Sequence, residues 1–402
     1  MNISYPAVNR KELYRFPWSR TDNPGGWIEV TDKCDISCKG CYRNQIEGHR
    51  PLADLQEDIL KCKELINCDY ITIAGGEPLI YPQIIEVVEF VKRNKLKPAI
   101  FSNGVKLDRN LATELKKAGL AKIHVHIDSE QERPGWYGKN ELELNELRQY
   151  YADLLWNVGG IQCGFHTTIY RSNIGYIPQI AAWARGNMQK VHHVSFIAFR
   201  STPVADNLSY YVKGRRIDPD SLYIKSSDLN EINITSEEMY NLVLAKYPGL
   251  KACGYLNGSS AYETYKFLVI ANIGSRKKHY GIMGAKSLEL AQMFYHLFKG
   301  RYFAFLNSPR IGKKVFLLAM FDRNVRKALG KFLVECLKNP VRLVEKVYTQ
   351  SFHFQQPNEI INGKLNLCDD CVNMMIYDGK LVNSCQLDEY RTFGAPVTVM
   401  ET

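Results

Sequence analysis

The sequence predicts an α/β protein built on a parallel sheet, followed by a helical insert and a small cysteine-rich C-terminal extension. Three observations lead to this fold class. Short β-prone runs alternate with helical patterns between residues 27 and 199. Helical periodicity and an excess of Lys and Arg mark residues 276–346, and three cysteines lie close together after residue 367. Strands that alternate with helices of this length are typical of βαβ units.

Six runs are expected to form the strands of the sheet, at 27–30, 70–74, 97–101, 123–127, 162–170 and 194–199. Apolar residues recur with helical spacing in the stretches between them, at 82–93, 110–117, 141–155 and 177–185. Chemistry in parallel barrels gathers at the carboxyl ends of the strands. We therefore expect the functional residues to follow these six runs.

The chain is expected to divide into four parts. A lead-in at 1–26 precedes the α/β core at 27–235, a basic and mainly helical segment covers 236–360, and the cysteine-rich extension covers 361–402. Within the basic segment, Thr235 and Glu238 form the pattern of a capping box that opens a helix. A chain of 402 residues suggests two or three domains of ~100–200 residues each.

Composition limits the class of protein. Apolar residues make up 45% of the chain, so a sizeable core can form. The first residues lack the basic start and apolar run of a secretory signal, and no stretch approaches the ~18 apolar residues of a membrane span. Eleven cysteines without such a signal indicate a reducing compartment. We expect a cytoplasmic protein, with membrane association left open.

The net charge of +10 is concentrated in one segment, because residues 276–346 carry sixteen Lys and Arg against four Asp and Glu. Three interpretations compete. The segment could be a helical subdomain with a solvated basic face. It could lie on an anionic membrane or enclose an amphiphilic substrate, as basic helices rich in Leu and Phe do. Nucleic-acid binding is the third, and no RNA-binding module accompanies it.

The motif around which the chain is organised follows the first strand. Cys34, Cys38 and Cys41 have the spacing C-x3-C-x2-C. Iron–sulfur clusters are held by cysteine thiolates, usually four for a [4Fe–4S] cluster, so three closely spaced thiolates would leave one iron open. A zinc knuckle or three buried thiols are the alternatives, although zinc usually needs a fourth ligand at a matching spacing.

These cysteines resemble the signature of the radical S-adenosylmethionine (SAM) enzymes. The resemblance implies a partial (βα)6 TIM-like barrel and a [4Fe–4S] cluster whose open iron binds the amino and carboxylate groups of SAM. An electron from the reduced cluster, supplied by a donor such as ferredoxin or flavodoxin, would cleave SAM to a 5′-deoxyadenosyl radical. One departure is visible, since many members carry a bulky residue just before the third cysteine and here it is Gly40.

The resemblance also implies SAM contacts at the ends of later strands. The Gly-Gly-Glu-Pro element after the second strand would contact the SAM amino group, and the turns after the third to fifth strands would reach its ribose or carboxylate. The residues concerned are Gly75, Gly76, Glu77, Ser102, Asn103, Asp128 and Arg171. A tight connection, a polar turn and a surface arginine are the ordinary alternatives for these positions.

Two histidines and a further arginine are candidates for contact with substrate. His124 and His126 share one face of the fourth strand, because residues two apart in a strand point the same way. They could form a proton relay or a substrate face, or they could be satisfied interior histidines. Arg200, after the sixth strand, is a weaker candidate for a substrate contact.

The extension carries a second metal signal. Cys368 and Cys371 form a CxxC pair, and Cys385 follows a predicted hairpin at Asp378-Gly379. The pattern resembles the twitch and SPASM-type extensions that hold auxiliary [4Fe–4S] clusters. It is a partial match, with Cys253, Cys336, another residue or substrate as the fourth ligand, and structural zinc is the rival. Cys62, Cys68 and Cys163 lack partner spacing and are expected to be buried hydrophobes.

The function that this resemblance implies is abstraction of hydrogen from an unactivated carbon. The basic insert favours a hydrophobic or lipid-like substrate and a peripheral membrane contact. A maturase of a ribosomal peptide or of a small-molecule natural product is the alternative. A non-catalytic iron–sulfur sensor that binds nucleic acid is the third interpretation, and it would not need the Gly-Gly-Glu-Pro element.

Overall fold

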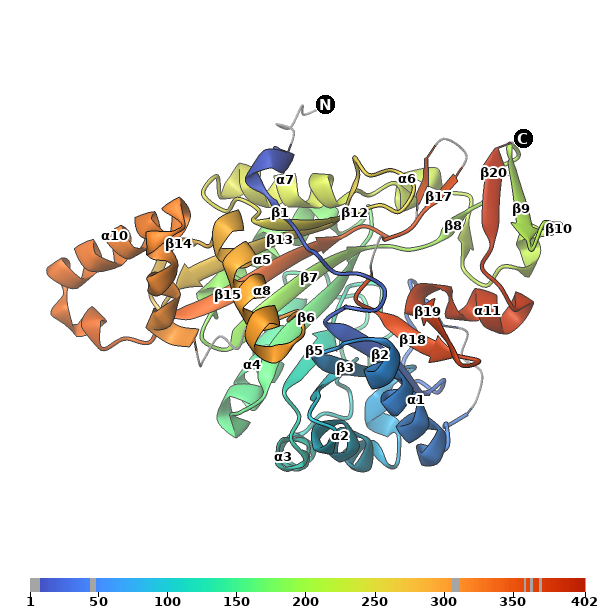
Figure 1. Ribbon diagram of the computed structural model, residues 1–402, viewed down its shortest axis with the longest axis horizontal. Coiled ribbons are helices and arrows are strands. Elements are labelled where there is room, and N and C mark those ends of the chain that lie inside the picture. Colours follow the sequence, from blue (N-terminus) through green and yellow to red (C-terminus); the bar gives the residue numbers. More distant parts are fainter. Residues whose placement is uncertain are drawn as a thin grey trace.

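The computed structural model describes residues 8–43, 48–305, 311–357, 359–361, 364–368 and 371–401. The first seven residues of the expected lead-in at 1–26 lie outside this described part. Figure 1 shows an elongated molecule, with helix α10 (Arg323–Lys338) at one end and the small sheet that contains β9 (Leu208–Val212) at the other. Among the described residues, no helix has both the length and the apolar character of a membrane span.

Six parallel strands form the centre of the main sheet, and each of the first five pairs with the next strand in the chain. They are β2 (Gly25–Thr31), β3 (Tyr70–Gly75), β4 (Lys97–Ser102), β5 (Lys122–His126), β6 (Gln162–Ile169) and β7 (Val191–Ala198). All six correspond to the strands predicted from the sequence. The prediction of an α/β fold with a partial (βα)6 barrel is confirmed.

Helices connect these strands and cover the outer face of the sheet. They are α1 (Leu52–Leu65), α2 (Ile84–Arg93), α3 (Arg109–Ala118), α4 (Leu144–Val158) and α5 (Ile177–Gly186). Helix α3 shows why they form where they do. Asp108 accepts a hydrogen bond from the amide of Leu111 at the first turn, and Gly119 ends the helix with a φ of 99°. Apolar faces of the helices and strands share one large hydrophobic cluster.

Strands from the second half of the chain extend the sheet beyond β7. Strand β15 (Tyr348–Gln355) pairs parallel with β7, and β13 (Tyr265–Gly274) pairs antiparallel with β15, β12 (Gly254–Asn257) and β14 (His279–Ile282). Strand β1 (Tyr14–Arg15), from the N-terminal part of the chain, pairs with β12 and completes this side. The segment 236–360 therefore contributes four strands to the main sheet, which its helical periodicity did not indicate. Strand β13 is almost entirely buried, so it lacks the alternation that reveals a half-exposed strand.

The other edge of the sheet is formed by the C-terminal hairpin. Strand β18 (Met374–Tyr377) pairs parallel with β2 and antiparallel with β19 (Lys380–Asn383). The turn between them has Asp378 and Gly379 at φ values of 48° and 69°, which is the conformation that an Asp-Gly hairpin turn requires. The predicted hairpin is confirmed, and it lies against the strand that leads into the three-cysteine loop.

The remaining helices pack at the two ends of this sheet. Helix α7 (Ser236–Lys246) begins at the predicted cap, where Thr235 accepts from the amide of Glu238. A second hydrophobic cluster joins α8 (Ala285–Lys299), the 3₁₀ helix η5 (Gly312–Met320) and α10 to the N-terminal residues Phe16 and Trp18. Other short elements are β8 (Thr202–Pro203), β10 (Arg215–Ile217), β11 (Lys225–Ser226), α6 (Leu229–Ile232), η6 (Pro340–Leu343), β16 (Glu359–Ile361), β17 (Lys364–Asn366), α11 (Leu387–Phe393) and β20 (Thr398–Glu401).

Candidate active site

The loop that carries Cys34, Cys38 and Cys41 follows β2 at the carboxyl end of the parallel strands. Its backbone is fixed by the loop that follows β5. Lys39 donates its amide to the carbonyl of Glu130 at 3.0 Å, and the amide of Glu132 donates to Ser37 at 2.9 Å. Cys38 therefore lies opposite Gln131 in a short antiparallel bridge. The loop that follows β5 therefore fixes the backbone around Cys38.

The three thiols are half-buried and close enough to influence one another. Burial raises the pKa of Cys34 and of Cys38, and the neighbouring thiols raise both further. Thiols in this environment stay protonated unless a cation replaces the protons. Among the described residues they do not form a compact group of the kind that would surround a single ion.

The backbone that leads into the cysteine loop is in direct contact with Gly75, Gly76 and Glu77. The amide of Gly76 donates to the carbonyl of Thr31 at 2.7 Å, and the amide of Glu77 donates to the carbonyl of Lys33 at 2.7 Å. A Cβ atom added to Gly76 would lie 2.1 Å from the Lys33 carbonyl oxygen. The glycine pair is required for this close approach, which fixes the entry to the loop.

The buried carboxylate of Glu77 ties the ends of β3 and β4 together. Its Oε1 accepts from the Ser102 hydroxyl at 2.7 Å and from the Leu79 amide at 2.8 Å, and its Oε2 accepts from the Asn103 amide at 2.6 Å. Burial raises the pKa of Glu77 to about 7, although these hydrogen bonds oppose the shift. Only one of these contacts uses Oε2, so that oxygen retains capacity for a further donor.

Asn103 connects β4 to the cysteine loop itself. Its side-chain amide donates to Asp35 Oδ1 at 2.6 Å and lies 3.7 Å from Cys34 Sγ. Asp35 Oδ2 is buried without a hydrogen-bond partner. Buried polar atoms are nearly always hydrogen-bonded, so an oxygen in this state next to Cys34 fits a position that a ligand would occupy.

His126 and Asp128 meet at the end of β5. His126 Nε2 lies 2.9 Å from Asp128 Oδ2 and 2.9 Å from the Thr168 hydroxyl. The carboxylate of Asp128 also raises the pKa of Cys38, so it faces the cysteine loop. Asp128 therefore lies beside the cysteine loop, and its contact with the SAM ribose stays a prediction. His124 lies deeper in the barrel and hydrogen-bonds His166 at 2.7 Å.

Arg171 is placed beside the loop, but its side chain is used elsewhere. Its guanidinium donates to the carbonyls of Asn230 and Asn233 and pairs with Glu238. The described contacts of the Arg171 guanidinium are therefore with α6, α7 and the residues between them. A contact between Arg171 and the SAM carboxylate stays a prediction. It would require the guanidinium to release at least one of these partners.

Tyr170 and Phe199 explain the departure at Gly40. A Cβ atom at position 40 would lie 2.4 Å from Tyr170 Oη and 3.1 Å from the ring of Phe199. The two rings pack with their centroids 5.2 Å apart. Aromatic side chains from the ends of β6 and β7 thus fill the space beside Gly40, which excludes a bulky residue before the third cysteine.

The C-terminal cysteines form a second group. Cys368 and Cys371 share a hydrogen bond that lowers the pKa of Cys368 and raises the pKa of Cys371, while Cys385 raises the pKa of Cys371 through its charge. Arg200 lies beside this group, where its charge lowers the pKa of Cys368 and opposes the rise in the pKa of Cys385. Arg200, expected near substrate, is therefore next to the extension.

Cysteines elsewhere are buried among apolar residues. Cys62, Cys68 and Cys163 belong to the large hydrophobic cluster, as expected. Cys253 and Cys336 belong to the second hydrophobic cluster, and the Cys253 thiol donates to the carbonyl of Val269 at 3.4 Å. The structure places these two thiols away from Cys368, so a non-cysteine fourth ligand is the simpler arrangement for the extension.

Several residues around the loop gave no recognisable signal in the sequence. Arg43 is buried, pairs with Glu29, and donates to the carbonyl of Ser384 at 2.6 Å. Arg133 is buried beside Cys38, where its charge lowers that pKa against the effect of burial. A small pocket of about 30 Å³ is lined by Tyr42, Arg200 and Cys385 among others. No local motif marks these residues, because long-range packing brings them together.

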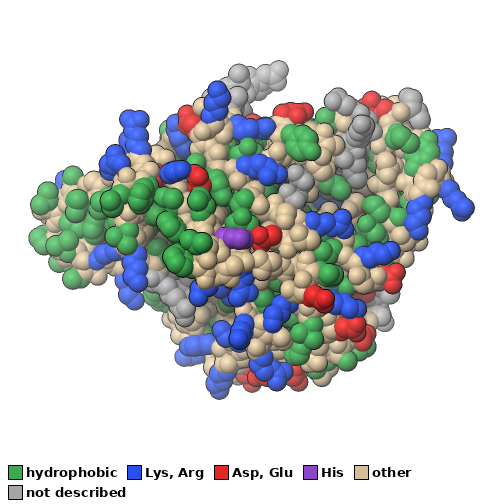
Figure 2. Space-filling view, viewed as in Figure 1, with side chains coloured by type: hydrophobic (Ala, Val, Ile, Leu, Met, Phe, Trp, Pro, Cys, Tyr) green, Lys and Arg blue, Asp and Glu red, His purple; other side chains and the backbone are tan. Residues whose placement is uncertain are grey.

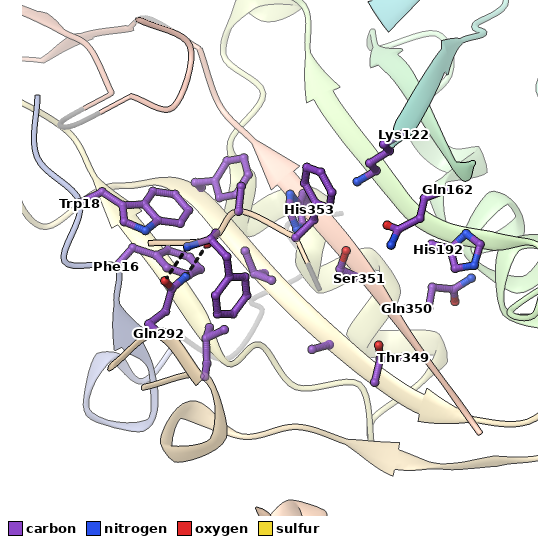
Figure 3. Close-up of a pocket in the computed structure, with 17 residues that line it drawn as sticks. Phe16, Trp18, Lys122, Gln162, His192, Gln292, Thr349, Gln350, Ser351 and His353 are labelled. Carbon is purple, nitrogen blue, oxygen red and sulfur yellow. Dashed lines mark hydrogen bonds between the residues drawn. The ribbon is translucent and has the colours of Figure 1, made fainter. Parts of the chain in front are cut away.

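A second, interior cavity of about 60 Å³ lies at the opposite end of the barrel strands. Figure 3 shows Lys122, Gln162, His192, Ser351 and His353 around it, with Phe16, Trp18 and Gln292 on the far wall. Burial lowers the pKa of Lys122 to about 7. No local pattern in the sequence marks this cavity, because its lining residues come from segments far apart in the chain.

Comparisons with known proteins relate the segment that carries the cysteine loop to one family. Residues 28–157 match the family model described as Radical SAM superfamily. The probable GTP 3′,8-cyclase of Methanocaldococcus jannaschii is 32% identical over 106 residues, which is 25% of this chain and 35% of that protein. The PqqA peptide cyclase of Gluconobacter oxydans is 28% identical over 161 residues, which is 39% of this chain and 44% of that protein.

The 7,8-dihydro-6-hydroxymethylpterin dimethyltransferase of Methanocaldococcus jannaschii is 25% identical over 53% of this chain and 43% of that protein. Among solved structures, Streptococcus suis SuiB bound to precursor peptide SuiA has a TM-score of 0.36 and 17% identity, covering 44% of this chain and 40% of that one. Native anSMEcpe with bound AdoMet has a TM-score of 0.39 and 12% identity, covering 56% of this chain and 59% of that one.

The chain contains a radical SAM domain, and this family implies a [4Fe–4S] cluster that binds SAM. The match is confined to the barrel and the cysteine loop. The chain spans less than half the length of the curated relatives with which it aligns.

Proposed function

We propose that this protein is a radical SAM enzyme in which Cys34, Cys38 and Cys41 hold the [4Fe–4S] cluster. The observation that carries the proposal is the loop of three half-buried thiols at the carboxyl end of the parallel strands, bordered by Glu77, Asn103 and Asp128. When bound, the reduced cluster and SAM supply the radical that abstracts hydrogen from an unactivated carbon. A small electron-transfer protein such as ferredoxin or flavodoxin would deliver the electron.

The chain's own residues would position these groups. Gly75 and Gly76 fix the entry to the loop, Glu77 Oε2 can accept a hydrogen bond from the SAM ammonium group, and Asn103 holds Asp35 beside Cys34. Ser102 orients Glu77 rather than facing outward. Asp128 is the acceptor best placed for a ribose hydroxyl, because His126 and the cysteine loop border its carboxylate.

We further propose that Cys368, Cys371 and Cys385 hold an auxiliary [4Fe–4S] cluster. The support is their mutual electrostatic influence together with the contacts that connect residues 42–43 to residues 384–389. A cluster at this position would adjoin Arg200 and could bind substrate or accept an electron.

A hydrophobic or lipid-like substrate at a membrane surface is the preferred proposal for the reaction. An exposed apolar surface covers α8, η5, α10 and η6, and Figure 2 shows it with Lys and Arg side chains around it. It consists of Met293, Phe294, Leu297, Phe298, Leu317, Met320, Phe321, Leu333, Val334, Leu337, Val341, Leu343 and Val344. Apolar patches of this extent with basic neighbours are typical of surfaces that bind anionic lipid.

This apolar surface would hold the protein at the membrane rather than line the catalytic face. Its residues precede β15, which runs parallel to β7, so the surface lies at the amino ends of the strands. The cysteine loop lies at their carboxyl ends. The substrate would have to reach the opposite end of the barrel from the docked surface.

A peptide or small-molecule maturase is the second candidate. The PqqA peptide cyclase and the pterin dimethyltransferase, with which the chain aligns, are named for substrates of these kinds. A non-catalytic sensor would bind SAM without cleaving it.

The production of 5′-deoxyadenosine tests the proposed function. Reconstituted protein is incubated anaerobically with SAM and a reductant, with either a lipid extract or an aqueous extract of the host. Stimulation by lipid supports the preferred substrate class, and stimulation by the aqueous extract alone supports the maturase. Absence of 5′-deoxyadenosine under all conditions, with both clusters present, contradicts the enzyme proposal.

A further inference from the structure

Four histidines occupy the interior of the barrel below the cysteine loop. His124, His166, His193 and His353 come from the adjacent strands β5, β6, β7 and β15. Their rings contact one another in sequence, with centroids 4.5 Å apart for His124 and His166 and 4.1 Å apart for His193 and His353. The interiors of parallel barrels are ordinarily filled by branched apolar side chains, so a run of imidazoles requires a reason.

Three of these rings are gathered tightly enough to share one ion. One ring nitrogen from each of His124, His166 and His193 lies within 4.8 Å of the other two, and it is the only such group among the residues that the structure describes. His166 Nε2 lies 2.7 Å from His124 Nδ1. His193 hydrogen-bonds the hydroxyls of Ser195 at 2.7 Å and Ser351 at 2.8 Å.

Two further features describe the hydrogen bonding and the packing of this group. His166 Nδ1 is buried without a hydrogen-bond partner, and the side chain is only 6% exposed. Gly164, on the strand between His124 and His193, lets the rings lie close against that strand. A Cβ atom there would lie 2.9 Å from His124 Nδ1 and 3.4 Å from His193 Cβ. Any larger residue at position 164 would displace the rings from one another.

The chemical state of the rings suits metal binding. Burial lowers the pKa of each of the three histidines well below 6.5, so each presents a neutral imidazole. Neutral imidazole is a good ligand for zinc, iron, cobalt, nickel and copper.

We propose that His124, His166 and His193 form a mononuclear site for a divalent transition metal of the zinc class, separate from both groups of cysteines. Zinc–nitrogen bonds of ~2.1 Å in a tetrahedral site would place two ligand nitrogens roughly 3.4 Å apart. The His124–His166 pair would therefore open by less than about 1 Å. The ring that donates in this pair can carry its proton on its other nitrogen instead, so no net proton loss is needed. The hydroxyl of Ser195 or Ser351, or a water molecule, would complete the coordination.

The cavity at the amino ends of the strands adjoins the surroundings of this site. Ser351 and His353 line that cavity (Figure 3), and both also contact His193. The site shares no residue with either group of cysteines, so its test does not require SAM, the reduced cluster or enzyme activity.

Cobalt titration of the whole protein provides the test. Purified, metal-depleted protein is titrated anaerobically with Co²⁺ and followed by its visible ligand-field bands. We expect one equivalent of Co²⁺ to bind without the near-ultraviolet charge-transfer band that thiolate ligands produce. We also expect Zn²⁺ to displace this equivalent of Co²⁺. The variants His166→Gln and His193→Gln should bind this equivalent at least about tenfold more weakly. His192→Gln, a half-buried neighbour outside the group, is the matched control.

The proposal is overturned if every cobalt component of the wild-type protein shows thiolate bands. It is also overturned if either histidine variant keeps the component that lacks those bands. The wild-type titration decides the matter even if a variant does not fold. A circular dichroism spectrum and the zinc-dependent shift of Tm are measured in parallel, because a bound metal raises Tm only when the native site is present. Free thiols in the two cysteine groups also bind Zn²⁺, so the Tm of His166→Gln should rise with Zn²⁺ by less than that of His192→Gln, and an equal rise in the two variants contradicts the proposal.

Discussion

Arg43 donates a hydrogen bond of 2.6 Å to the carbonyl of Ser384, and this contact joins the cysteine loop to the C-terminal extension. Arg43 stands two residues after Cys41, and Ser384 stands immediately before Cys385. The guanidinium is buried and also pairs with Glu29 on β2 and with Asp388 at 3.6 Å. The two groups of cysteines are therefore supported by one buried cation.

Replacing this cation should destabilise the protein strongly. Arg43→Met leaves the buried Glu29 carboxylate without its partner, which typically costs about 3–5 kcal/mol. The double variant Arg43→Met/Glu29→Gln should recover much of that loss, because the unpaired charge is gone. Urea unfolding measures both. A single variant that loses less than about 1 kcal/mol, comparable to an exposed pair, would show that Arg43 does not hold the two segments together.

Gly76→Ala should impair assembly of the cysteine loop. The added Cβ atom would meet the Lys33 carbonyl at 2.1 Å, and backbone at that distance has to move. We expect the iron content after anaerobic reconstitution to fall by at least half, while the far-ultraviolet spectrum is retained. Gly175→Ala is the control, since nothing lies within 4 Å of a Cβ atom there. Equal iron content in the two variants would contradict the proposed role of the glycine.

Glu77 should give the stability a distinctive pH dependence. Its pKa is raised to about 7 in the folded protein from 4.5, because burial disfavours the charged form. The folded state therefore holds this proton more tightly than the unfolded state, and the associated stability is present below pH 4.5 and is lost as the pH rises through about 7. Glu77→Gln removes this dependence. Chemical unfolding at several pH values should show a smaller decline between about pH 5 and 8 in the variant than in the wild type.

If the C-terminal cysteines hold a cluster, the protein should bind iron even when the cysteines of the first loop are absent. A variant with Cys34, Cys38 and Cys41 all replaced by Ala should retain up to about four irons per chain after reconstitution, as expected for one [4Fe–4S] cluster. Adding Cys371→Ala should remove them, whereas adding Cys163→Ala, a buried thiol in the large hydrophobic cluster, should not. If the triple variant holds no iron, or holds one zinc instead, the extension does not carry an auxiliary cluster.

The sequence allowed the six central strands and the cysteine loop to be predicted, because each depends on a local run or a short spacing. Strands β13 and β15 were missed, since their partners lie far away in the chain and β13 has no alternating pattern. Asp128 and Asn103 lie beside the cysteine loop at the ends of their strands, and their contacts with SAM stay predictions. Arg43 and the histidines at 166, 193 and 353 were not, because only the register of neighbouring strands brings them to their partners.

The apolar surface on α8, η5, α10 and η6 predicts binding to anionic vesicles. Phe298 and Leu337 are 76% and 85% exposed, and basic side chains including Lys299 and Lys338 lie beside them in the sequence. Burying such a side chain in a bilayer interface contributes about 1.5–3 kcal/mol. The variants Phe298→Glu and Leu337→Glu should therefore each reduce co-sedimentation with phosphatidylglycerol-containing vesicles by about tenfold.

Two controls separate this effect from general surface changes. Tyr137→Glu alters a side chain that is 77% exposed but lies outside the apolar surface, and it should bind vesicles as the wild type does. Raising the salt concentration should weaken wild-type binding, because the basic residues contribute through long-range attraction that salt screens. If Leu337→Glu and Tyr137→Glu bind the vesicles equally well, the apolar surface does not bind the membrane and serves another partner. The substrate would then have to be sought without reference to the membrane.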